Sequence, residues 1–199
     1  MNFGSQTENY NEENKHIINY LIDPIRNKHK IKNLDLQTGK GIDFTGNIYN
    51  DEFLEYMKQF KFDVILLCNV LEHVVDIDSL CQRVQVLLSE DGFLVFSGPN
   101  DYPTHYDPID NGFRPTISEV SDLFKDLSFV KGEIVPDFTF SFYILKSPKF
   151  VITQLLRLLT PFYKYNKWKS VVLPKFLYWN KQFKVTCVIL KKKHKHLSL

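Results

Sequence analysis

The segment Phe62–Cys68 is the strongest constraint on the fold of this chain. It is an almost continuous apolar run with polar residues on both sides, which is typical of a strand buried on both faces of a parallel sheet. Neighbouring parallel strands need long crossover connections, which are usually helices. The 199 residues, 44% of them hydrophobic, suffice for one domain of this kind built around one core.

Apolar runs and helical patterns alternate along most of the chain. A pattern of apolar residues at helical spacing follows Asp76 or Asp78 as a cap, and Thr116 with Glu119 forms a capping-box pattern before another helix. This order predicts an α/β fold with a doubly wound, mostly parallel sheet whose two faces are both covered. We predict strands at residues 1–3, 31–36, 42–48, 62–68, 93–97, 129–135 and 183–190.

Between residues 137 and 181 this alternation stops. Ser147-Pro148 suits a helix start, and residues 150–159 are apolar on most sides of the helix that they predict. Because a strand pattern resumes at 183–190, we interpret 137–181 as a helical insert within a single domain of residues 1–199. Two hypotheses stay open for its apolar faces: burial against the domain, or contact with a membrane interface.

Charge is distributed unevenly along the chain. Residues 146–199 contain 13 Lys and Arg and no Asp or Glu, whereas residues 1–145 contain 12 bases and 23 acids. A basic, aromatic-rich segment ending in the tail 191–199 suits anionic lipid headgroups, and nucleic acid less well because the bases are interleaved with Leu, Val and Phe. The alternative is a solvated basic surface with a terminal tail.

Several other classes of protein do not fit this sequence. No apolar run reaches the length of a membrane-spanning helix, and the first residues lack the order of a secretory signal, so we expect a cytoplasmic protein that is peripheral on the inner membrane face. Three cysteines without paired spacing predict neither disulfides nor a zinc site. Glu72-His73 has no second His/Glu pair nearby, so we expect no metal and assign these residues to shaping the loop.

Motifs beyond the buried strand carry a family resemblance. Residues 69–74 (NVLEHV), 87–95 (LLSEDGFLV) and 98–100 (GPN) resemble class I S-adenosylmethionine-dependent methyltransferases. Residues 105–110 (HYDPID) and 113–116 (FRPT) are similar to a bacterial subgroup, methyltransferase type 11/12-like, that is associated with modifying glycans or other surface molecules. The resemblance implies a Rossmann-like sheet with an antiparallel last strand, S-adenosyl-L-methionine as cofactor and methyl transfer (EC 2.1.1.-).

The resemblance also implies a cofactor site at the carboxyl ends of the strands. Asp35 would accept both ribose hydroxyls, since a carboxylate offers two acceptors to a cis diol; the alternative is an ordinary Asp at a strand end. Asn47 stands where the family commonly has an acidic residue. The first strand starts at Met1, so we expect a short or truncated central strand. The remaining positions are Gly4 and Ser5 on the first loop, Leu36, Ile48 and Cys68 around the adenine, and Asn69 beside the methionine part.

The loop after residues 93–97 holds the candidates for catalysis. His105 would remove the proton of a hydroxyl acceptor, because imidazole titrates near neutral pH, and Asp107 would orient it or serve as the base. Tyr106 and Arg114 would bind the acceptor. The alternative is that this loop contains only turn formers and an arginine brace.

The sequence is therefore compatible with two functions. The first is methylation, on oxygen, of a glycan, a lipid-linked molecule or another small-molecule acceptor. The second is a degenerate, non-catalytic domain that binds a membrane surface or a protein partner.

Overall fold

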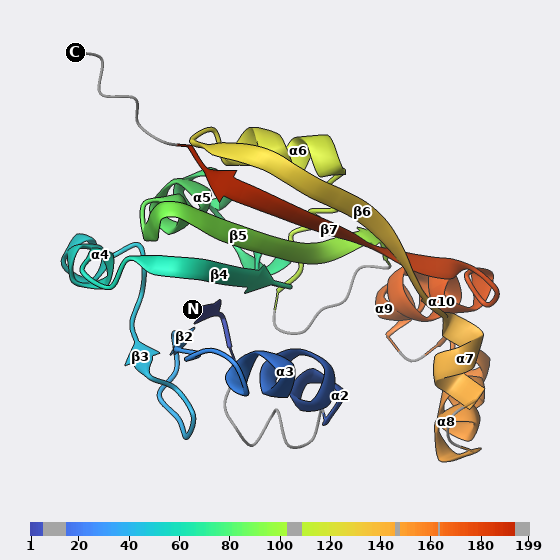
Figure 1. Cartoon of the computed structure of the whole chain (residues 1–199). Coiled ribbons are helices and arrows are strands. Elements are labelled where there is room, and N and C mark those ends of the chain that lie inside the picture. Colours follow the sequence, from blue (N-terminus) through green and yellow to red (C-terminus); the bar gives the residue numbers. More distant parts are fainter. Residues whose placement is uncertain (6–14, 103–108, 146–147, 163, 194–199) are drawn as a thin grey trace, which may run out of the picture.

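The protein forms a seven-stranded sheet with helices packed against it (Figure 1). The computed structural model describes residues 1–5, 15–102, 109–145, 148–162 and 164–193. The strand order is β3-β2-β1-β4-β5-β7-β6. All pairs from β3 to β5 are parallel, and β7 runs antiparallel to β5 and β6. The predicted α/β class and the antiparallel last strand are confirmed. The strands are β1 (Asn2–Phe3), β2 (Asn33–Asp35), β3 (Phe44–Thr45), β4 (Phe62–Cys68), β5 (Leu88–Asp101), β6 (Leu127–Thr139) and β7 (Gln182–Lys192).

Helices connect these strands. α5 begins after Asp76, whose side chain accepts a hydrogen bond from the Ser79 N–H. α6 begins with the predicted capping box of Thr116 and Glu119, so both predicted helix starts are confirmed. The described helical segments are α2 (Lys15–Ile17), η1 (Ile18–Ile22), α3 (Asp23–Arg26), α4 (Asp51–Lys58), η2 (Leu71–His73), α5 (Ile77–Gln85), α6 (Ile117–Leu123), α7 (Phe140–Leu145), α8 (Pro148–Leu159), α9 (Tyr165–Lys167), η3 (Trp168–Val172) and α10 (Leu173–Leu177).

The main core lies on one side of the long strands. Side chains of β4 and β5 that point to this side, among them Ile65, Leu67 and Phe96, are fully buried against residues of α4, α5 and α6. Burial of each such side chain stabilises the fold by roughly 1.5–3 kcal/mol. The core therefore rests on the strands that the sequence predicts most clearly.

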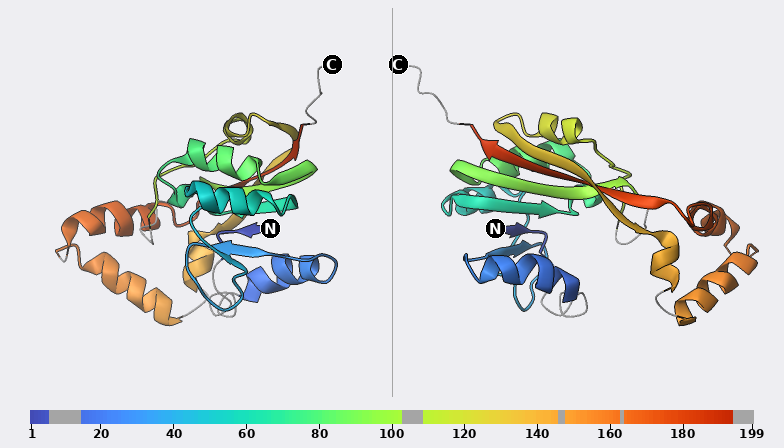
Figure 2. Two further views of the ribbon diagram at one scale, coloured as in Figure 1. Left: turned by 90° about the vertical axis from the view of Figure 1, so that its left-hand side faces the viewer. Right: turned by 45° about the vertical axis from the view of Figure 1, so that its right-hand side comes forward.

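Among the described residues, the opposite face of the long strands is only partly covered, and we call it the open face. Leu66, which points to this face, is 7% exposed, so the prediction that both faces are covered holds only in part for this half of the sheet. In Figures 1 and 2, α5 and α6 lie behind the sheet, whereas the segment from α2 to α3 lies in front, beside β1 and β2. Val64 of β4 is 39% exposed, although we predict a strand buried on both faces. Between β2 and β3 the described chain makes turns and no helix, so this crossover covers neither face.

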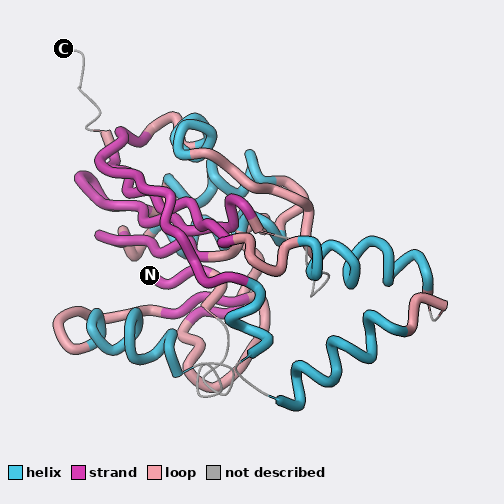
Figure 3. Tube along the Cα trace, turned by 90° about the vertical axis from the view of Figure 1, so that its right-hand side faces the viewer, coloured by secondary structure: helices cyan, strands magenta, loops and turns pink. Residues whose placement is uncertain are grey.

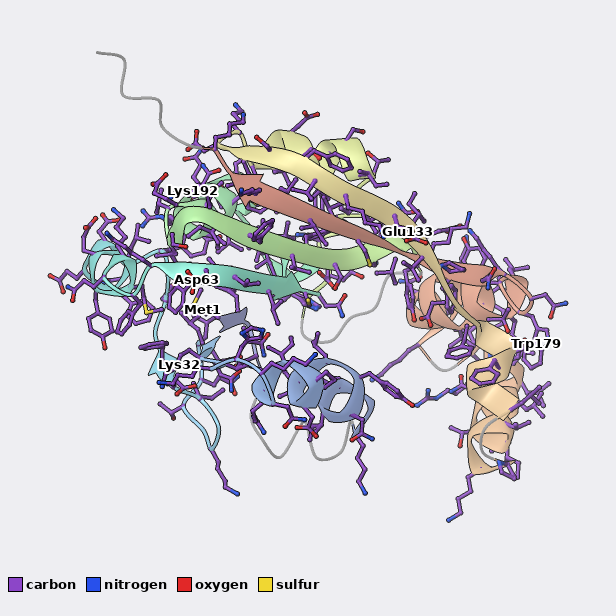
Figure 4. The ribbon with its side chains drawn as sticks, viewed as in Figure 1. Met1, Lys32, Asp63, Glu133, Trp179 and Lys192 are labelled. Atoms are coloured by element: carbon purple, nitrogen blue, oxygen red, sulfur yellow. The ribbon has the colours of Figure 1, made fainter. Side chains whose placement is uncertain are left out.

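The strands β1, β2 and β3, which form one side of the sheet, are short. β1 is only two residues long, and the Met1 amino group donates a hydrogen bond to the Val64 carbonyl on β4 (2.5 Å). In Figure 4, Met1 and Asp63 lie on these neighbouring strands. Burial lowers the pKa of this amino group to about 6. The predicted short central strand is thus observed, and its two partners β2 and β4 hold it in register.

Helices α7 to α10 lie between β6 and β7 and project from one end of the sheet (Figures 1 and 3). Where they join the sheet, Phe183 packs with Tyr102, Val151 and Trp179 in a small apolar cluster that is separate from the main core. Among the described residues, no helix has the length and apolar character needed to cross a membrane.

Candidate functional site

The carboxyl ends of five strands meet along one edge of the sheet. Phe3 pairs with Leu34 of β2 and Leu67 of β4, so the next residue, Gly4, lies beside Asp35 on one side and Cys68 on the other. Asp35 in turn pairs with Thr45, and Cys68 pairs with Ser97. Neighbouring strands are about 4.8 Å apart. Gly4, Asp35 and Cys68, which are far apart in sequence, therefore form one continuous row.

The turn after β1 is shaped for Gly4. Its φ of +67° is in the left-handed region that side chains rarely adopt, and a Cβ there would lie 2.9 Å from Cγ2 of Val70. The N–H groups of Gly4 and Ser5 both donate to the Leu34 carbonyl, at 2.9 and 3.2 Å. At this loop a ligand could therefore contact the backbone of Gly4, which carries no side chain, and the hydroxyl of Ser5.

Ser5 contains an unusual atom. Its side chain is buried, and its Oγ is the one buried side-chain polar atom of the described residues that lacks a hydrogen-bond partner. A buried polar group without a partner costs about 1–3 kcal/mol. Such a group directly after the central strand marks a place where a bound molecule would supply the partner.

The ends of β2 and β3 hold the other predicted cofactor positions. Asp35 accepts a hydrogen bond from the Gln37 N–H through Oδ1 (2.9 Å). The Asn47 side chain accepts one from the Tyr49 N–H (3.0 Å), so its acceptor oxygen holds the turn. Ile48 is buried, whereas Leu36 is 70% exposed in this ligand-free structure, and its place beside the adenine stays a prediction.

The end of β4 places the last two predicted cofactor residues. Burial raises the pKa of the Cys68 thiol, which keeps it neutral. Asn69 has φ +53°, a conformation that Asn tolerates better than most residues, and its N–H donates to the Ser97 carbonyl on β5 (2.8 Å). β4 thus ends in a sharp turn beside Gly4.

The loops after β4 and β5 are joined to each other. The Asn111 side-chain amide donates to the carbonyls of Leu71 and Val74, both at 2.7 Å, and its N–H donates to the Glu72 carbonyl (2.9 Å). Nδ1 of His73 hydrogen-bonds the Ile109 carbonyl. Hydrogen bonds to backbone carbonyls therefore bring the motif residues of the two loops together. The spacing of these residues in the sequence does not indicate such contacts.

Arg114 stabilises the same loop. Its guanidinium forms a bidentate ion pair with Asp110 (2.6 and 3.0 Å), and its Nε donates to the Tyr102 carbonyl. The carboxylate of Asp110 is fully buried. These contacts agree with the alternative in which Arg114 braces the loop. Its predicted role in binding the acceptor stays a prediction. The candidate base His105, with Tyr106 and Asp107, lies outside the described residues.

Within the described part of the chain, no group of three or more His, Cys, Asp or Glu side chains is arranged to hold a metal ion. Glu72 is buried, and together with His73 it belongs to the loop contacts. Asp110 and Asn111 are residues that the sequence indicates only as turn formers. Asn111 joins the two loops, and Asp110 pairs with Arg114 within the loop after β5. In the sequence these two residues belong to the run Asp-Asn-Gly, which predicts a turn. It does not predict which distant residues their side chains contact.

Comparison of the sequence with protein-family models and with curated proteins found no match. Solved structures do match. A putative sarcosine dimethylglycine methyltransferase from Galdieria sulphuraria superposes with a TM-score of 0.54 at 10% identity, over 98% of this chain and 77% of that one.

Two further structures are more distant. An S-adenosylmethionine-dependent methyltransferase from Archaeoglobus fulgidus has a TM-score of 0.44 at 13% identity, over 96% of this chain and 84% of its own. Phosphoethanolamine N-methyltransferase 2 of Haemonchus contortus has a TM-score of 0.40 at 15% identity, over 67% of this chain. The chain spans only 34% of the length of that enzyme. The strand order and the Galdieria structure together show that this chain has the fold of the class I S-adenosylmethionine-dependent methyltransferases.

Proposed function

We propose that this protein is an S-adenosylmethionine-dependent methyltransferase that methylates an oxygen of a glycan, a lipid-linked molecule or another small-molecule acceptor. The observation that carries the proposal is the row of Gly4, Asp35 and Cys68 along the carboxyl edge of the sheet. In open α/β sheets this edge is where ligands bind. The motif resemblance of residues 69–74 and 98–100 and the Haemonchus structure, which contains S-adenosylhomocysteine, support the same cofactor.

The residues at this edge fit the cofactor chemically. The unpartnered hydroxyl of Ser5 needs a polar partner, and the backbone of Gly4 packs so closely against Val70 that a side chain there would force the turn to shift. Asp35 carries a carboxylate, which offers two acceptor oxygens to a cis diol. Gly4, Ser5 and Asp35 would hold the amino-acid and ribose parts, with Ile48 and Cys68 beside the base and Asn69 near the methionine part.

In the proposed reaction the protein mainly binds and orients the reactants and accepts one proton. When bound, S-adenosylmethionine supplies an electrophilic methyl group on a sulfonium. The chain would position the acceptor oxygen in line with that group. His105 would accept the hydroxyl proton, Asp107 would orient the imidazole, and Tyr106 with Arg114 would hold the acceptor.

Two glycines provide a matched test of cofactor binding. Gly4 and Gly112 both have positive φ, but a Cβ at Gly112 would meet nothing within 4 Å. Both Gly→Ala variants should lose about 1–2 kcal/mol of stability from backbone strain. In calorimetric titration with S-adenosylmethionine, only Gly4→Ala should also lose affinity, by about tenfold or more, or roughly 1.4 kcal/mol. If the unaltered protein shows neither heat nor a thermal shift at millimolar cofactor, the proposal is wrong.

The acceptor step needs a separate experiment. Transfer of a labelled methyl group into a fraction of lipid-linked glycans should require His105. His105→Ala should leave cofactor affinity unchanged and slow transfer by about 10²-fold or more. Equal loss of cofactor binding would instead mean that His105 has a structural role.

The second candidate is the degenerate binding domain. It is favoured by the two-residue β1 and by Asn47, an uncharged residue whose acceptor oxygen is engaged by Tyr49. A protein of this kind would keep its partner when Gly4 is replaced, and it would not bind the cofactor. The titration described above separates the two functions.

A further inference from the structure

α8 exposes its leucines and buries a glutamine. Four residues, Ile152, Leu155, Leu156 and Leu159, have exposed fractions between 48% and 71%, whereas Gln154 is only 3% exposed. At 100° per residue the four lie within about 100° of helix surface and form one stripe. We call these four residues the outer stripe. A helix that packs on a core in water has the opposite arrangement.

The inner side of α8 is already occupied. Val151 packs in the cluster around Phe183, and Nε1 of Trp168 donates to the Leu158 carbonyl (3.1 Å), which attaches α8 to η3. In Figure 3, α8 and the segment from α9 to α10 run as two arms away from the sheet. The outer stripe therefore faces away from the helices and strands to which α8 is fixed.

Other apolar side chains continue this surface beyond α8. Leu145, Phe162, Tyr165 and Leu177 are each more than half exposed. In Figure 4, Trp179 lies at the base of this helical region, where it joins β7. Exposed apolar surface of this extent, concentrated in one projecting region, is the mark of a binding surface.

The charge of the region identifies the partner. Lys149 and Arg157 are exposed on α8. At 100° per residue Lys149 lies about 20° beyond one border of the outer stripe, and Arg157 lies about 100° beyond the same border. Lys169 on η3 is also exposed. The last acidic residue of the chain is Asp137, so residues 138–199 have nothing that would repel an anionic surface. Apolar residues flanked by bases suit a bilayer interface with anionic headgroups.

We propose that the helices between residues 140 and 181 attach the protein to anionic lipid bilayers, with the outer stripe of α8 inserted among the acyl chains and Lys149 and Arg157 at the headgroups. An anionic bilayer is favoured over other partners because the exposed apolar side chains belong to a segment that contains bases and no acids after Asp137. The proposal is independent of the proposed enzymatic activity, since neither the stripe nor its bases belong to the cofactor edge.

Flotation with vesicles tests the proposal. The full chain should float with vesicles of phosphatidylcholine and phosphatidylglycerol, bind pure phosphatidylcholine vesicles at least about tenfold more weakly, and be released as salt is raised from about 0.1 to 1 M. Ile152→Gln with Leu156→Gln should reduce binding by about tenfold or more. Val75→Gln with Tyr20→Ser, two exposed apolar positions outside the region, should leave it unchanged.

Charge reversal provides a second comparison. Lys149→Glu with Arg157→Glu should reduce binding to anionic vesicles by about tenfold or more, while Lys28→Glu with Lys30→Glu, exposed near the end of α3, should have little effect. Circular dichroism and thermal unfolding would verify that each variant is folded.

Four results would overturn the proposal. The protein could remain unbound to both kinds of vesicle. The outer-stripe variant could bind as well as the unaltered chain. Size-exclusion chromatography could show that the stripe variant dissociates a dimer that does not bind vesicles, which would assign the stripe to a second copy of the chain. Binding of duplex or single-stranded nucleic acid by the unaltered chain, without vesicle binding, would likewise assign the bases elsewhere.

Discussion

The two halves of the sheet are built differently. β1, β2 and β3 are two or three residues long, and their ends hold the positions predicted for the cofactor. β4, β5, β6 and β7 are seven to fourteen residues long, and they contribute nine buried residues to the main core, against three from the short strands. The comparison teaches that the long strands supply more of the stability, whereas the short strands mainly present predicted cofactor positions, which the end of β4 completes.

The largest expected effect is on the core of the long strands. Phe96 of β5 is buried, so Phe96→Ala should lower the free energy of unfolding by about 3–5 kcal/mol. Leu36→Ala, at the exposed end of β2, should change it by less than about 0.5 kcal/mol. Urea unfolding monitored by circular dichroism measures both. Similar losses in the two variants would remove the contrast between the two halves.

The next effect concerns the loop after β5. The Asp110–Arg114 ion pair is buried on the carboxylate side, and removing one partner leaves a charge without compensation, so Asp110→Asn should cost about 3 kcal/mol. Asp91 and Lys191 form an exposed ion pair in the same half of the sheet. Asp91→Asn should cost less than about 1 kcal/mol. Equal costs in urea unfolding would show that burial does not set the strength of these ion pairs.

Ser5 should respond in the opposite direction. Ser5→Ala removes a buried hydroxyl that has no partner, so the ligand-free protein should become more stable by about 1 kcal/mol, while its affinity for S-adenosylmethionine falls. Thr186 is also buried, but its Oγ donates to the Pro115 carbonyl (2.6 Å). Thr186→Val should therefore destabilise the protein by about 1 kcal/mol. Thermal unfolding with and without cofactor tests both signs, and a loss of stability in Ser5→Ala would contradict the assignment.

The smallest effects distinguish the two faces of the long strands. Burial raises the pKa of the Cys81 thiol to about 12 on the covered side, whereas Cys187 is half-buried on the open face. Because the thiolate is the reactive form, alkylation of Cys81 should rise about tenfold per pH unit from pH 7 to 10 without a plateau. Cys187 should react faster at every pH. Mass spectrometry after iodoacetamide treatment measures both rates, and faster reaction of Cys81 would mean that the open face is covered in solution.

Local patterns predicted the helix starts and the long strands well. The capping residues Asp76 and Thr116 lie where they were expected because a cap depends on neighbours three residues away. β5 is longer than predicted, since it begins at Leu88 and passes Asp91-Gly92, where its pairing with β4 shifts register. A turn-forming pair of residues can also make a bulge, and only the partner strand decides between the two.

The sequence by itself determined the α/β class, the antiparallel last strand implied by the family resemblance, the positive segment from residue 146 onward, and Gly4 and Asp35 as candidate ligand positions. Those features depend on residue type and near-neighbour spacing. Only the tertiary structure decided that Leu36 is exposed, that Asn111 joins two loops, that one face of the long strands is only partly covered and that α8 exposes its leucines while burying Gln154. These features depend on contacts between segments far apart in the chain. Periodicity in the sequence predicts which residues share a helix face, but it does not predict which part of the protein, or which partner, that face contacts.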